Sequence, residues 1–512
     1  VTLTYQSRGG QAEVVRAETD ASTDYTVRFE LERLAAGTRY GYSMRFVPVG
    51  GAARYVAEGA FSTAPPANTK TPVKLAWSAD LAGQNVCRDS ERGFPIFGPL
   101  LERQPDLFVA VGDMVYADSS CRAVGRLGNA QVATPVGPAR DVEAFRRHWH
   151  YARDDALHRR FLASVPSYAT WDDHEVINNC GPTEDEVRIT PESEPIRLMP
   201  MGRDVFLEQN PIRLHPREPG RIYRSVRWGR HLHLFILDTR QYREPSTARD
   251  DAEHPKSMLG EAQRQWLIDA AGSSDATWQV IVSSTPLVIP VGPPEARDGW
   301  ASGGAATGYS RELRGIIDDL RAAGVVNVIW LSADVHFATF FRHQVDEGYE
   351  VFEAIAGPLN AKVLPVPEFD DYLGTERLFM HPERGDMTSF DAALKWFNFG
   401  LLEIDASGQA VVRYVDATFA AVQTFARPLN WTQSAVIFGD DSRVFAVGAG
   451  ADGTGATGDE TLQVWQARAL GATNDAVVLP LSTGITSPVP LNVPFVPVST
   501  DWGVILSPGL DG

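Results

Sequence analysis

The stretch Asp106-Leu-Phe-Val-Ala-Val-Gly-Asp-Met-Val-Tyr116 decides how the rest of this 512-residue chain is interpreted. Its apolar run predicts a strand over Asp106–Val111 that is buried on both faces, as in parallel sheets covered by helices. Gly112 ends the strand, so Asp113 stands directly beyond its carboxyl end. Open α/β sheets bind their ligands at that edge. The stretch therefore predicts an α/β sheet with an acidic ligand-binding edge.

Four further motifs repeat this arrangement along the chain. Each places an acidic residue just after a predicted apolar strand: Trp77-Ser-Ala-Asp80, Trp171-Asp-Asp173-His174-Glu175, Leu237-Asp238-Thr-Arg240 and Leu331-Ser-Ala-Asp334-Val-His336. A single strand-end Asp is commonly a turn former, whereas the whole set predicts carboxylates that converge at one edge of the sheet. Carboxylates a few ångströms apart repel one another. A bound metal is the simplest source of compensating positive charge.

The residue types predict two metal sites that share one carboxylate. The first contains a phenolate, which suits ferric iron: Asp80, Asp113, Tyr116 and His336. The second offers oxygen ligands alone, which favours Ca²⁺, Mg²⁺ or Mn²⁺ over zinc: Asp113, Asp173 and Asp334. Two metals about 3.5–4 Å apart clamp the attacking and leaving oxygens of a displacement at phosphorus. We expect a metal-bound hydroxide as the nucleophile, so no Ser or Cys nucleophile is needed.

Charge and composition exclude several classes of function. The net charge of −18, from 65 acidic and 47 basic residues, argues against a stable nucleic-acid partner, which needs a basic surface. It says little against a small anionic substrate, because local charge governs such binding. No apolar run reaches the roughly 18 residues that span a bilayer, so no transmembrane segment is expected. The sequence also lacks P-loop, dinucleotide-binding and Gly-x-Ser-x-Gly motifs, which leaves kinase, oxidoreductase and serine-esterase functions without support.

The pattern of the chain predicts three segments. Residues 1–66 predict a small β-sandwich with four strands: Val1–Tyr5, Thr26–Leu31, Arg39–Val47 and Arg54–Thr63. Its turn and tyrosine strand at Leu34–Tyr42 resemble fibronectin type III domains. Residues 67–430 alternate strands with helices, which implies a sheet covered on both faces, and include a long helical stretch at Glu143–Ala163. Residues 431–512 are rich in Gly, Ala, Thr and Pro and predict a β-rich extension.

The order of the acidic motifs resembles the metallophosphatase (calcineurin-like phosphoesterase) superfamily, and more closely the alkaline phosphatase D family. Trp171–Asn179, Leu237–Arg243 and Ser332–His336 are similar to signature stretches of that family. The resemblance implies an αββα sandwich core behind an N-terminal fibronectin-like β-sandwich. It also implies Fe³⁺ at the first predicted site and Ca²⁺ at the second. Asp80 stands where well-known members carry Cys, which leaves Mn or Zn open in place of iron.

Residues next to the predicted ligands have two interpretations each. His174 resembles the histidine that contacts phosphoryl oxygens or protonates the leaving group in the superfamily, and the alternative is a His buried against the sheet. Arg240 could clamp a phosphate oxygen, or form a structural ion pair with Asp238 or a helix end. Asn178 and Asn179 could add carbonyl ligands to Ca²⁺, or form a turn.

Other residues are expected to shape the loops around the site. Cys87 and Cys121 each follow a predicted ligand by seven or eight residues, on loops expected to lie side by side. One alternative is a disulfide between them that leaves out Cys180, and the other is free thiols. Trp300 and Tyr309 resemble a family loop that roofs the site. The basic stretch Arg146–Arg160, with His148, His150 and His158, is expected mainly as a solvated helix face, although some of its residues could rim a pocket and attract an anion.

The expected function is an alkaline phosphatase or phosphodiesterase that acts on small phosphate esters. We expect a secreted, periplasmic or cell-surface protein. The sequence begins at Val1 and shows no signal peptide, so for an exported protein a targeting segment has been removed or left out. A phospholipase-D-like phosphodiesterase on the same centre is the nearest alternative. A surface binding protein with a vestigial site is the alternative of a different class.

Overall fold

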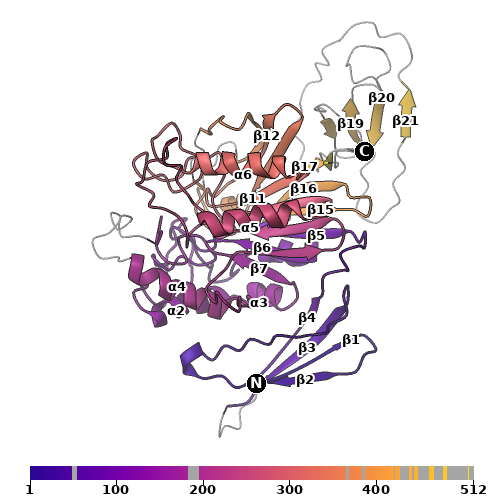
Figure 1. Cartoon of the computed structure of the whole chain (residues 1–512). Helices are drawn as coiled ribbons and strands as arrows, with labels where there is room; N and C mark the ends of the chain where they lie inside the picture. Colours follow the sequence, from indigo (N-terminus) through magenta and orange to yellow (C-terminus); the bar gives the residue numbers. More distant parts are fainter. Residues whose placement is uncertain are drawn as a thin grey trace.

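The computed structural model describes residues 1–48, 55–182, 195–364, 368–382 and 387–419, together with short strands in the remainder of the chain. Two β-sheets lie face to face at the centre of the molecule, and helices cover their outer faces (Figure 1). A separate N-terminal sheet lies beside this core at the bottom of the view. A small C-terminal sheet lies at the top.

The first core sheet is built around three parallel strands that carry the predicted acidic motifs at their ends. They are β5 (Val73–Ser78), β6 (Leu107–Val111) and β7 (Ser167–Thr170). Three antiparallel strands extend the sheet beyond β5: β15 (Asn398–Ile404), β16 (Ala410–Asp416) and β17 (Ala421–Ala426). Four helices lie on the outer side of this sheet: α1 (Phe97–Arg103), α2 (Val142–Arg153), α3 (Ala156–Leu162) and α4 (Pro195–Gln209).

The second core sheet has seven strands in the order β14-β12-β13-β11-β10-β9-β8. Its central strands are parallel: β9 (Leu232–Ile236), β10 (Trp278–Val282), β11 (Val328–Ser332) and β13 (Tyr349–Ile355). Its antiparallel strands are β8 (Arg224–Trp228), β12 (Ala338–Asp346) and β14 (Thr375–His381). The helices α5 (Gly260–Gly272) and α6 (Ser310–Ala322) pack on its outer face. A short helix, α7 (Phe390–Ala393), precedes β15.

The uninterrupted apolar run of β6 is explained by burial on both faces of its sheet. Leu107, Val109 and Val111 pack into the core between the two sheets. Phe108 and Ala110 point the other way and pack into the core under the helices. Because successive side chains of a strand alternate between faces, only a continuous apolar run fills both cores. The prediction of an α/β core is confirmed, with two stacked sheets between helical layers.

The prediction of a strand at Thr26–Leu31 is wrong. Residues 1–66 contribute one four-stranded antiparallel sheet, β2-β1-β3-β4: β1 (Thr2–Ser7), β2 (Glu13–Arg16), β3 (Arg39–Phe46) and β4 (Tyr55–Ser62). The segment expected as a strand packs on this sheet through Phe29 and Leu31, while Arg28 donates a hydrogen bond to the backbone oxygen of Leu207 in α4. An apolar cover of irregular chain thus occupies the place of a second sheet, and the described residues do not show the predicted sandwich.

The long helical stretch expected at Glu143–Ala163 is divided into α2 and α3. Asp155 lies between them and caps α3, because its side chain accepts a hydrogen bond from the backbone N–H of His158 at 2.8 Å. Its other carboxylate oxygen accepts from the backbone N–H of Phe94 at 3.1 Å. The Asp155 carboxylate accepts hydrogen bonds from the first turn of α3 and from a neighbouring loop. This arrangement requires the helix to break at Asp155.

The C-terminal part contains a second small antiparallel sheet in the order β18-β19-β20-β21. Its strands are β18 (Ile437–Asp440), β19 (Arg443–Val447), β20 (Thr461–Trp465) and β21 (Val477–Pro480), and the short β22 (Ile505–Leu506) returns to pair with β16 of the core. The predicted domain boundary at residues 430 and 431 lies outside the described residues. Among the described residues, the helices are all too short or too polar to cross a bilayer.

Candidate metal centre

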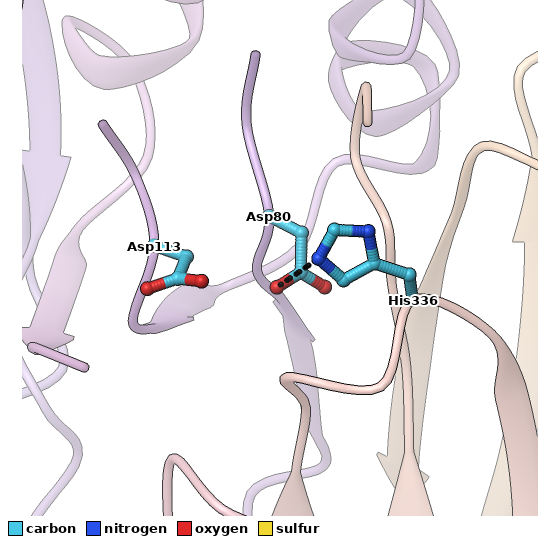
Figure 2. Close-up of side chains that lie close together, drawn as sticks. All are labelled: Asp80, Asp113 and His336. Carbon is cyan, nitrogen blue, oxygen red and sulfur yellow. Dashed lines mark ion pairs between the residues drawn. The ribbon is translucent and has the colours of Figure 1, made fainter. Parts of the chain in front are cut away.

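The predicted ligands meet where strands of the two core sheets end. Asp80 follows β5, Asp113 follows β6 and Asp173 follows β7, while Asp334 follows β11 of the other sheet. Figure 2 shows the Asp80 and Asp113 carboxylates beside the imidazole of His336. The two sheets face each other, so loops from both reach the same rim.

Three overlapping groups of side chains at this rim can hold a cation. Within each group the ligand atoms lie within 4.8 Å of one another, and Asp113 belongs to all three: Asp80–Asp113–His336, Asp113–Asp173–His174 and Asp113–Asp172–Asp173–Asp334. The Tyr116 hydroxyl joins the first group, because it lies 2.9 Å from Nε2 of His336. The structure therefore brings together all six predicted ligands, and it places Asp113 where it could bridge two cations.

The backbone at the rim adopts a conformation that side chains of L-residues rarely allow. The φ angles of Asp80, Asp113, Asp334 and His336 are 63°, 51°, 69° and 57°. Each such residue costs of order 1–3 kcal/mol, and they cluster at sites where function requires the geometry. Gly357 belongs to the same arrangement, since a Cβ added there would lie 2.4 Å from Oδ2 of Asp80. Close packing around Asp80 therefore requires a glycine at position 357.

The carboxylates of the rim lack the partners that buried carboxylates normally have. Both oxygens of Asp80 and the Oδ2 atoms of Asp113 and Asp334 are buried without a hydrogen-bond partner. Burial raises the pKa of all three groups above the ordinary value, and neighbouring carboxylates raise it further. Buried polar groups are otherwise almost always satisfied. The orphaned oxygens fit a site for cations, because a bound cation would supply both the missing partner and the missing charge.

His336 is oriented as a neutral metal ligand. Its Nδ1 lies 2.6 Å from the backbone oxygen of Lys362, which requires an Nδ1–H donor and leaves the lone pair on Nε2. Burial lowers the pKa of His336 to about 4, so the ring stays neutral at physiological pH. Nε2 lies 3.6 Å from Oδ1 of Asp80, inside the first group of candidate ligands. The Lys362 carbonyl thus selects the tautomer that metal binding needs.

Glu175 holds the backbone of two neighbouring strand ends in place. Its Oε1 accepts from the N–H of Met114 at 2.7 Å, and its Oε2 accepts from the N–H groups of Asp113 and Asp172 at 3.0 and 2.8 Å. The side chain is fully buried. Three backbone donors on one carboxylate fix the left-handed turn that presents Asp113. Glu175 belongs to the motif Trp171-Asp-Asp173-His174-Glu175, and no role was predicted for it.

His174 stands at the edge of the rim in a pair with Asp118. Its Nδ1 lies 2.8 Å from Oδ2 of Asp118, and its ring lies over that of Tyr116 with 4.2 Å between centroids. Burial lowers the pKa of His174, but Asp118 and Asp173 outweigh burial and raise the pKa to about 10. Asp118 was not predicted. Its position two residues after Tyr116 in the same motif was the only signal for it.

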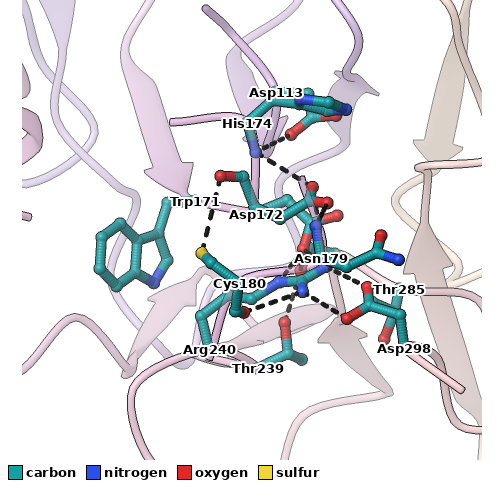
Figure 3. Close-up of polar contacts among 12 residues, drawn as sticks. Asp113, Trp171, Asp172, His174, Asn179, Cys180, Thr239, Arg240, Thr285 and Asp298 are labelled. Atoms are coloured by element: carbon teal, nitrogen blue, oxygen red, sulfur yellow. Dashed lines mark hydrogen bonds and ion pairs between the residues drawn. The ribbon is translucent and has the colours of Figure 1, made fainter. Parts of the chain in front are cut away.

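Arg240 lies in a closed ion-pair network rather than in an open site (Figure 3). The side chain is fully buried and forms two parallel hydrogen bonds to Asp298, at 2.9 and 2.8 Å, and a third from Nε to Asp172 at 2.6 Å. Arg243 donates to the same Asp298 at 2.9 Å. This geometry favours the structural alternative, with Asp172 and Asp298 as ion-pair partners in place of the expected Asp238. Asp238 accepts a hydrogen bond from the backbone N–H of Arg240 and others from Trp171 and Gln241.

The two cysteines on the predicted neighbouring loops form a disulfide, Cys87–Cys121, and the buried Cys180 lies outside it. The expectation that Trp300 and Tyr309 roof the site is wrong, because both are fully buried in the core under α5 and α6. Their loop approaches the rim through the preceding residues 289–292 instead.

A cleft of about 440 Å³ opens above the rim. Its lining includes polar residues: Gln84, Asp173, His174, Asn178, Asn179, Asp334 and His336. It also includes apolar residues: Ile289, Pro290, Val291, Val335, Phe337 and Leu364. Asn178 and Asn179 donate backbone N–H groups to Asp118 and Asp173, at 2.9 and 2.5 Å. This shows the predicted turn, while calcium ligation by their side chains stays a prediction.

The strand-end rim on two stacked sheets is the arrangement of a metallophosphatase-type phosphatase. The family model described as PhoD-like phosphatase matches residues 75–413, so the chain belongs to the PhoD-like phosphatase family. Alkaline phosphatase D of Bacillus subtilis (strain 168) is 27% identical over 277 residues, which cover 51% of this chain and 46% of that protein. The match therefore spans about half the length of this curated relative. The predicted resemblance to the alkaline phosphatase D family is confirmed.

Two solved structures share the fold. The structure titled "Structure of PhoD" superposes with a TM-score of 0.61 at 18% identity, over 88% of this chain and 83% of that chain. A purple acid phosphatase from yellow lupin (Lupinus luteus) seeds superposes with a TM-score of 0.54 at 10% identity, over 83% of this chain and 68% of that chain. At these identities the likeness is one of fold.

Proposed function

We propose that this protein is a metal-dependent phosphoesterase that hydrolyses small phosphate esters. The observation that carries the proposal is the buried rim of orphaned carboxylate oxygens around Asp113, completed by the neutral Nε2 of His336. Membership of the PhoD-like phosphatase family supports the same reaction class. A cluster of unpaired carboxylates has no stabilising role of its own, because each buried charge costs free energy until a cation binds.

The donor sets support two different cations. Fe³⁺ would be held by Asp80, Asp113, Tyr116 and His336, because a phenolate and a carboxylate pair are hard anionic donors. Ca²⁺ would be held by Asp113, Asp173 and Asp334, since all donors there are oxygens. Mn or Zn at the first site remains the alternative, given Asp80. When bound, such a pair of cations polarises the phosphoryl oxygens and activates a water molecule.

The chain's own residues would orient the substrate and handle its protons. His174 lines the cleft and is held by Asp118 through Nδ1, so its Nε2 is the free ring nitrogen. We propose that this nitrogen donates a hydrogen bond to a phosphoryl oxygen or a proton to the leaving group. Arg240 would act as a positioning residue, because it contacts Asp172 and lies 3.8 Å from Oδ1 of Asp173.

Metal removal and return test the proposal. We expect a strong chelator to abolish hydrolysis of a chromogenic phosphate ester, and Ca²⁺ with Fe³⁺ to restore it. Full turnover after exhaustive metal removal, verified by elemental analysis, would refute the reaction assignment. The iron assignment has its own readout, because an iron–phenolate bond absorbs visible light. We expect coloured protein that bleaches in Tyr116→Phe; active, colourless protein without iron would contradict Fe³⁺ and leave the two-cation centre intact.

A phospholipase-like phosphodiesterase is the second candidate, and the apolar residues in the lining of the cleft favour it. Pro290, Val291 and Leu364 are half-buried in the cleft lining and can contact an apolar ester arm while the phosphate lies at the rim. A panel of a phosphomonoester, a short diester and phosphatidylcholine separates the two functions. Preference for phosphatidylcholine, reduced selectively in Val291→Ser, would establish the second candidate.

We propose export to an oxidising compartment as the setting of this activity. The Cys87–Cys121 disulfide supports this location, because structural disulfides are rare where thiols are kept reduced. Fractionation of cells that produce the natural protein tests the proposal. Recovery of the active enzyme solely from the cytosol would contradict it.

A further inference from the structure

A large cavity lies between the N-terminal sheet and the core, away from the cleft above the rim. Its volume is about 780 Å³. Tyr42 and Phe61 of the N-terminal sheet line one side, and Tyr168 of β7 and Arg224 of β8 line another. β7 and β8 are the edge strands of the two core sheets, so the cavity sits at the open side of the stacked sheets. Figure 1 shows the N-terminal sheet next to this side of the core.

The N-terminal sheet is docked at this position by direct contacts. The N–H of Ala60 donates to the backbone oxygen of Ala163 at 3.0 Å, and Arg146 pairs with Glu208 while it also donates to the backbone oxygen of Ser22. Arg213 forms an ion pair with Glu30 at 3.2 Å across the same junction. The cavity walls are therefore held together by both parts of the chain.

The charge of the cavity is opposite to that of the chain. Four arginines line it, Arg153, Arg213, Arg221 and Arg224, and the lining includes no Asp or Glu within the part of the chain that the structure describes. The chain as a whole carries a net charge of −18. Local accumulation of one sign of charge in a partly enclosed space attracts ligands of the other sign.

Three of these arginines have no carboxylate partner among the described residues. Arg153 donates to the backbone oxygen of Gln209 and to Oδ1 of Asn210, while its Nε is buried without a partner. Arg224 donates only to the backbone oxygens of Ile222 and Ala169.

Arg221 donates to a backbone oxygen and lies 3.9 Å from the centre of the Tyr223 ring. Burial lowers the pKa of Arg153 and of Arg224 to about 10, because it disfavours the charged form of each guanidinium. A partly desolvated guanidinium without a counter-ion is costly, and a bound anion would remove that cost.

We propose that this interdomain cavity binds a small organic anion, with a phosphate or carboxylate group on an aromatic or apolar body. Guanidinium groups pair with either anion through parallel hydrogen bonds. Tyr168, Tyr223 and Trp266 supply flat apolar walls for the body. A volume of this size is typical of pockets for such molecules. The basic helical stretch Arg146–Arg160 was expected mainly as a solvated helix face, but its Arg153 and His158 line this cavity.

Binding of two matched probes to the metal-loaded protein tests the proposal: 1-naphthylphosphonate for the phosphate arm and 1-naphthoate for the carboxylate arm. Titration calorimetry should show one site per chain for at least one probe. Arg153→Met and Arg224→Met should each weaken binding by at least about tenfold. Arg160→Met, on the exposed face of α3, should leave affinity unchanged. Because the phosphonate can also bind cations at the rim, the arm that binds more tightly to the Asp113→Asn variant identifies the anionic group.

Two further variants keep the outcome decisive. Asp113→Asn should retain probe binding, since the rim is a different site; loss of binding there would assign the probe to the metal centre and overturn the proposal. Arg221→Gln removes a guanidinium that donates to one backbone oxygen and lies over two aromatic rings. This variant tests the proposal if the Arg153 and Arg224 variants do not fold. Unchanged affinity in a folded Arg221→Gln protein, together with unchanged or untestable Arg153 and Arg224 variants, would also overturn the proposal.

Discussion

Two acidic clusters lie side by side in this protein and differ in how their charge is compensated. At the rim, Asp80, Asp113 and Asp334 keep buried oxygens without partners. In the neighbouring cluster, both oxygens of Asp298 accept hydrogen bonds from guanidinium groups of Arg240 and Arg243. The rim can therefore accept cations, whereas the neighbouring cluster is already neutralised by the chain. We infer that the rim serves chemistry and that the Arg240 cluster serves stability.

Asp172 and Asp173 connect the two clusters. Asp172 accepts from Arg240 at 2.6 Å through one oxygen, while its other oxygen is buried without a partner. Its neighbour Asp173 is one of the predicted ligands and belongs to two of the candidate groups. Asp172 thus contacts Arg240 through one oxygen and belongs with Asp173 to a candidate cation group, so both residues lie where the two clusters meet. Substitutions on either side should separate catalysis from stability.

The largest effect is expected for Asp113→Asn. Removal of the shared carboxylate should lower turnover at least roughly 10⁴-fold, because both cations would lose a ligand that contributes several kcal/mol to the transition state. Steady-state turnover and metal content by elemental analysis check this prediction. The matched control is Asp269→Asn on the exposed surface of α5, which should behave as the wild type.

The same substitution should not destabilise the metal-free protein. The pKa of Asp113 is raised by burial and by nearby carboxylates, so its charge opposes folding when no cation is bound. After chelation, the melting temperature of Asp113→Asn should equal or exceed that of the wild type. The stabilisation gained on adding metal should be smaller in the variant, because ligand binding stabilises in proportion to RT ln(1 + [L]/Kd). A lower melting temperature in the metal-free variant would contradict the uncompensated state of the rim.

Arg240→Met should have the opposite profile. Loss of the guanidinium leaves Asp172 and Asp298 as buried charges without their main partner, which typically costs about 3–5 kcal/mol. Urea unfolding of the metal-free protein measures this loss. Arg240→Lys should lose less, since it keeps the charge but not the planar pair of donors. Wild-type stability combined with a large fall in turnover would instead support the phosphate-clamp role predicted for Arg240.

Glu175→Gln should act between these extremes. The amide replaces one acceptor with a donor that faces the N–H groups of Asp113, Met114 or Asp172. Metal affinity should fall about 10–100-fold, as for other residues that orient ligands without binding the metal. Turnover per bound metal should change less.

Glu312→Gln is the matched control for Glu175→Gln. Glu312 is also a buried carboxylate that accepts from the backbone N–H groups of Met258 and Leu259, and it lies in the first turn of α6, away from the rim. Glu312→Gln should lower the free energy of unfolding and leave metal affinity unchanged. Equal losses of metal affinity in the two variants would show that Glu175 acts only through global stability.

The rim could be predicted from the sequence because its information is local. A strand such as Leu107–Val111 is recognised by its own apolar run, and parallel strands place their carboxyl ends at one edge without further assumptions. Asp80, Asp113 and Asp173 follow from that rule, whereas Asp334 ends a strand of the other sheet and reaches the rim because the two sheets face each other. Asp118 was within reach of the same reasoning, since it shares the motif of Asp113 and Tyr116.

The Arg240 cluster could not be predicted in the same way. Asp298 lies 58 residues from Arg240 in an irregular loop, and no periodicity connects them. The wrong strand at Thr26–Leu31 has a related cause. Its composition favours extended backbone, but a strand also requires a partner with free hydrogen-bonding groups, and Phe29 and Leu31 pack on a sheet face instead of a sheet edge. Long-range partners decide both features, and one sequence does not contain them.

The smallest effect is expected for Ser284→Ala, which tests the boundary between the two clusters. The Ser284 hydroxyl donates to Oδ1 of Asp172 at 2.8 Å, the same oxygen that Arg240 contacts. A hydrogen bond to a charged group contributes about 1.5–3 kcal/mol, and we expect the lower end because Arg240 remains in place. Turnover should fall less than about tenfold, which corresponds to 1.4 kcal/mol.

Ser283→Ala is the matched control. The Ser283 hydroxyl donates to the backbone oxygen of Thr285 and accepts from Nε1 of Trp300, and both partners are neutral. Its removal should lower the free energy of unfolding by about 1 kcal/mol. Equal losses of unfolding free energy in the two variants would show that Asp172 carries little charge in the folded protein. The proposed difference in charge compensation between the rim and the Arg240 cluster would then be wrong.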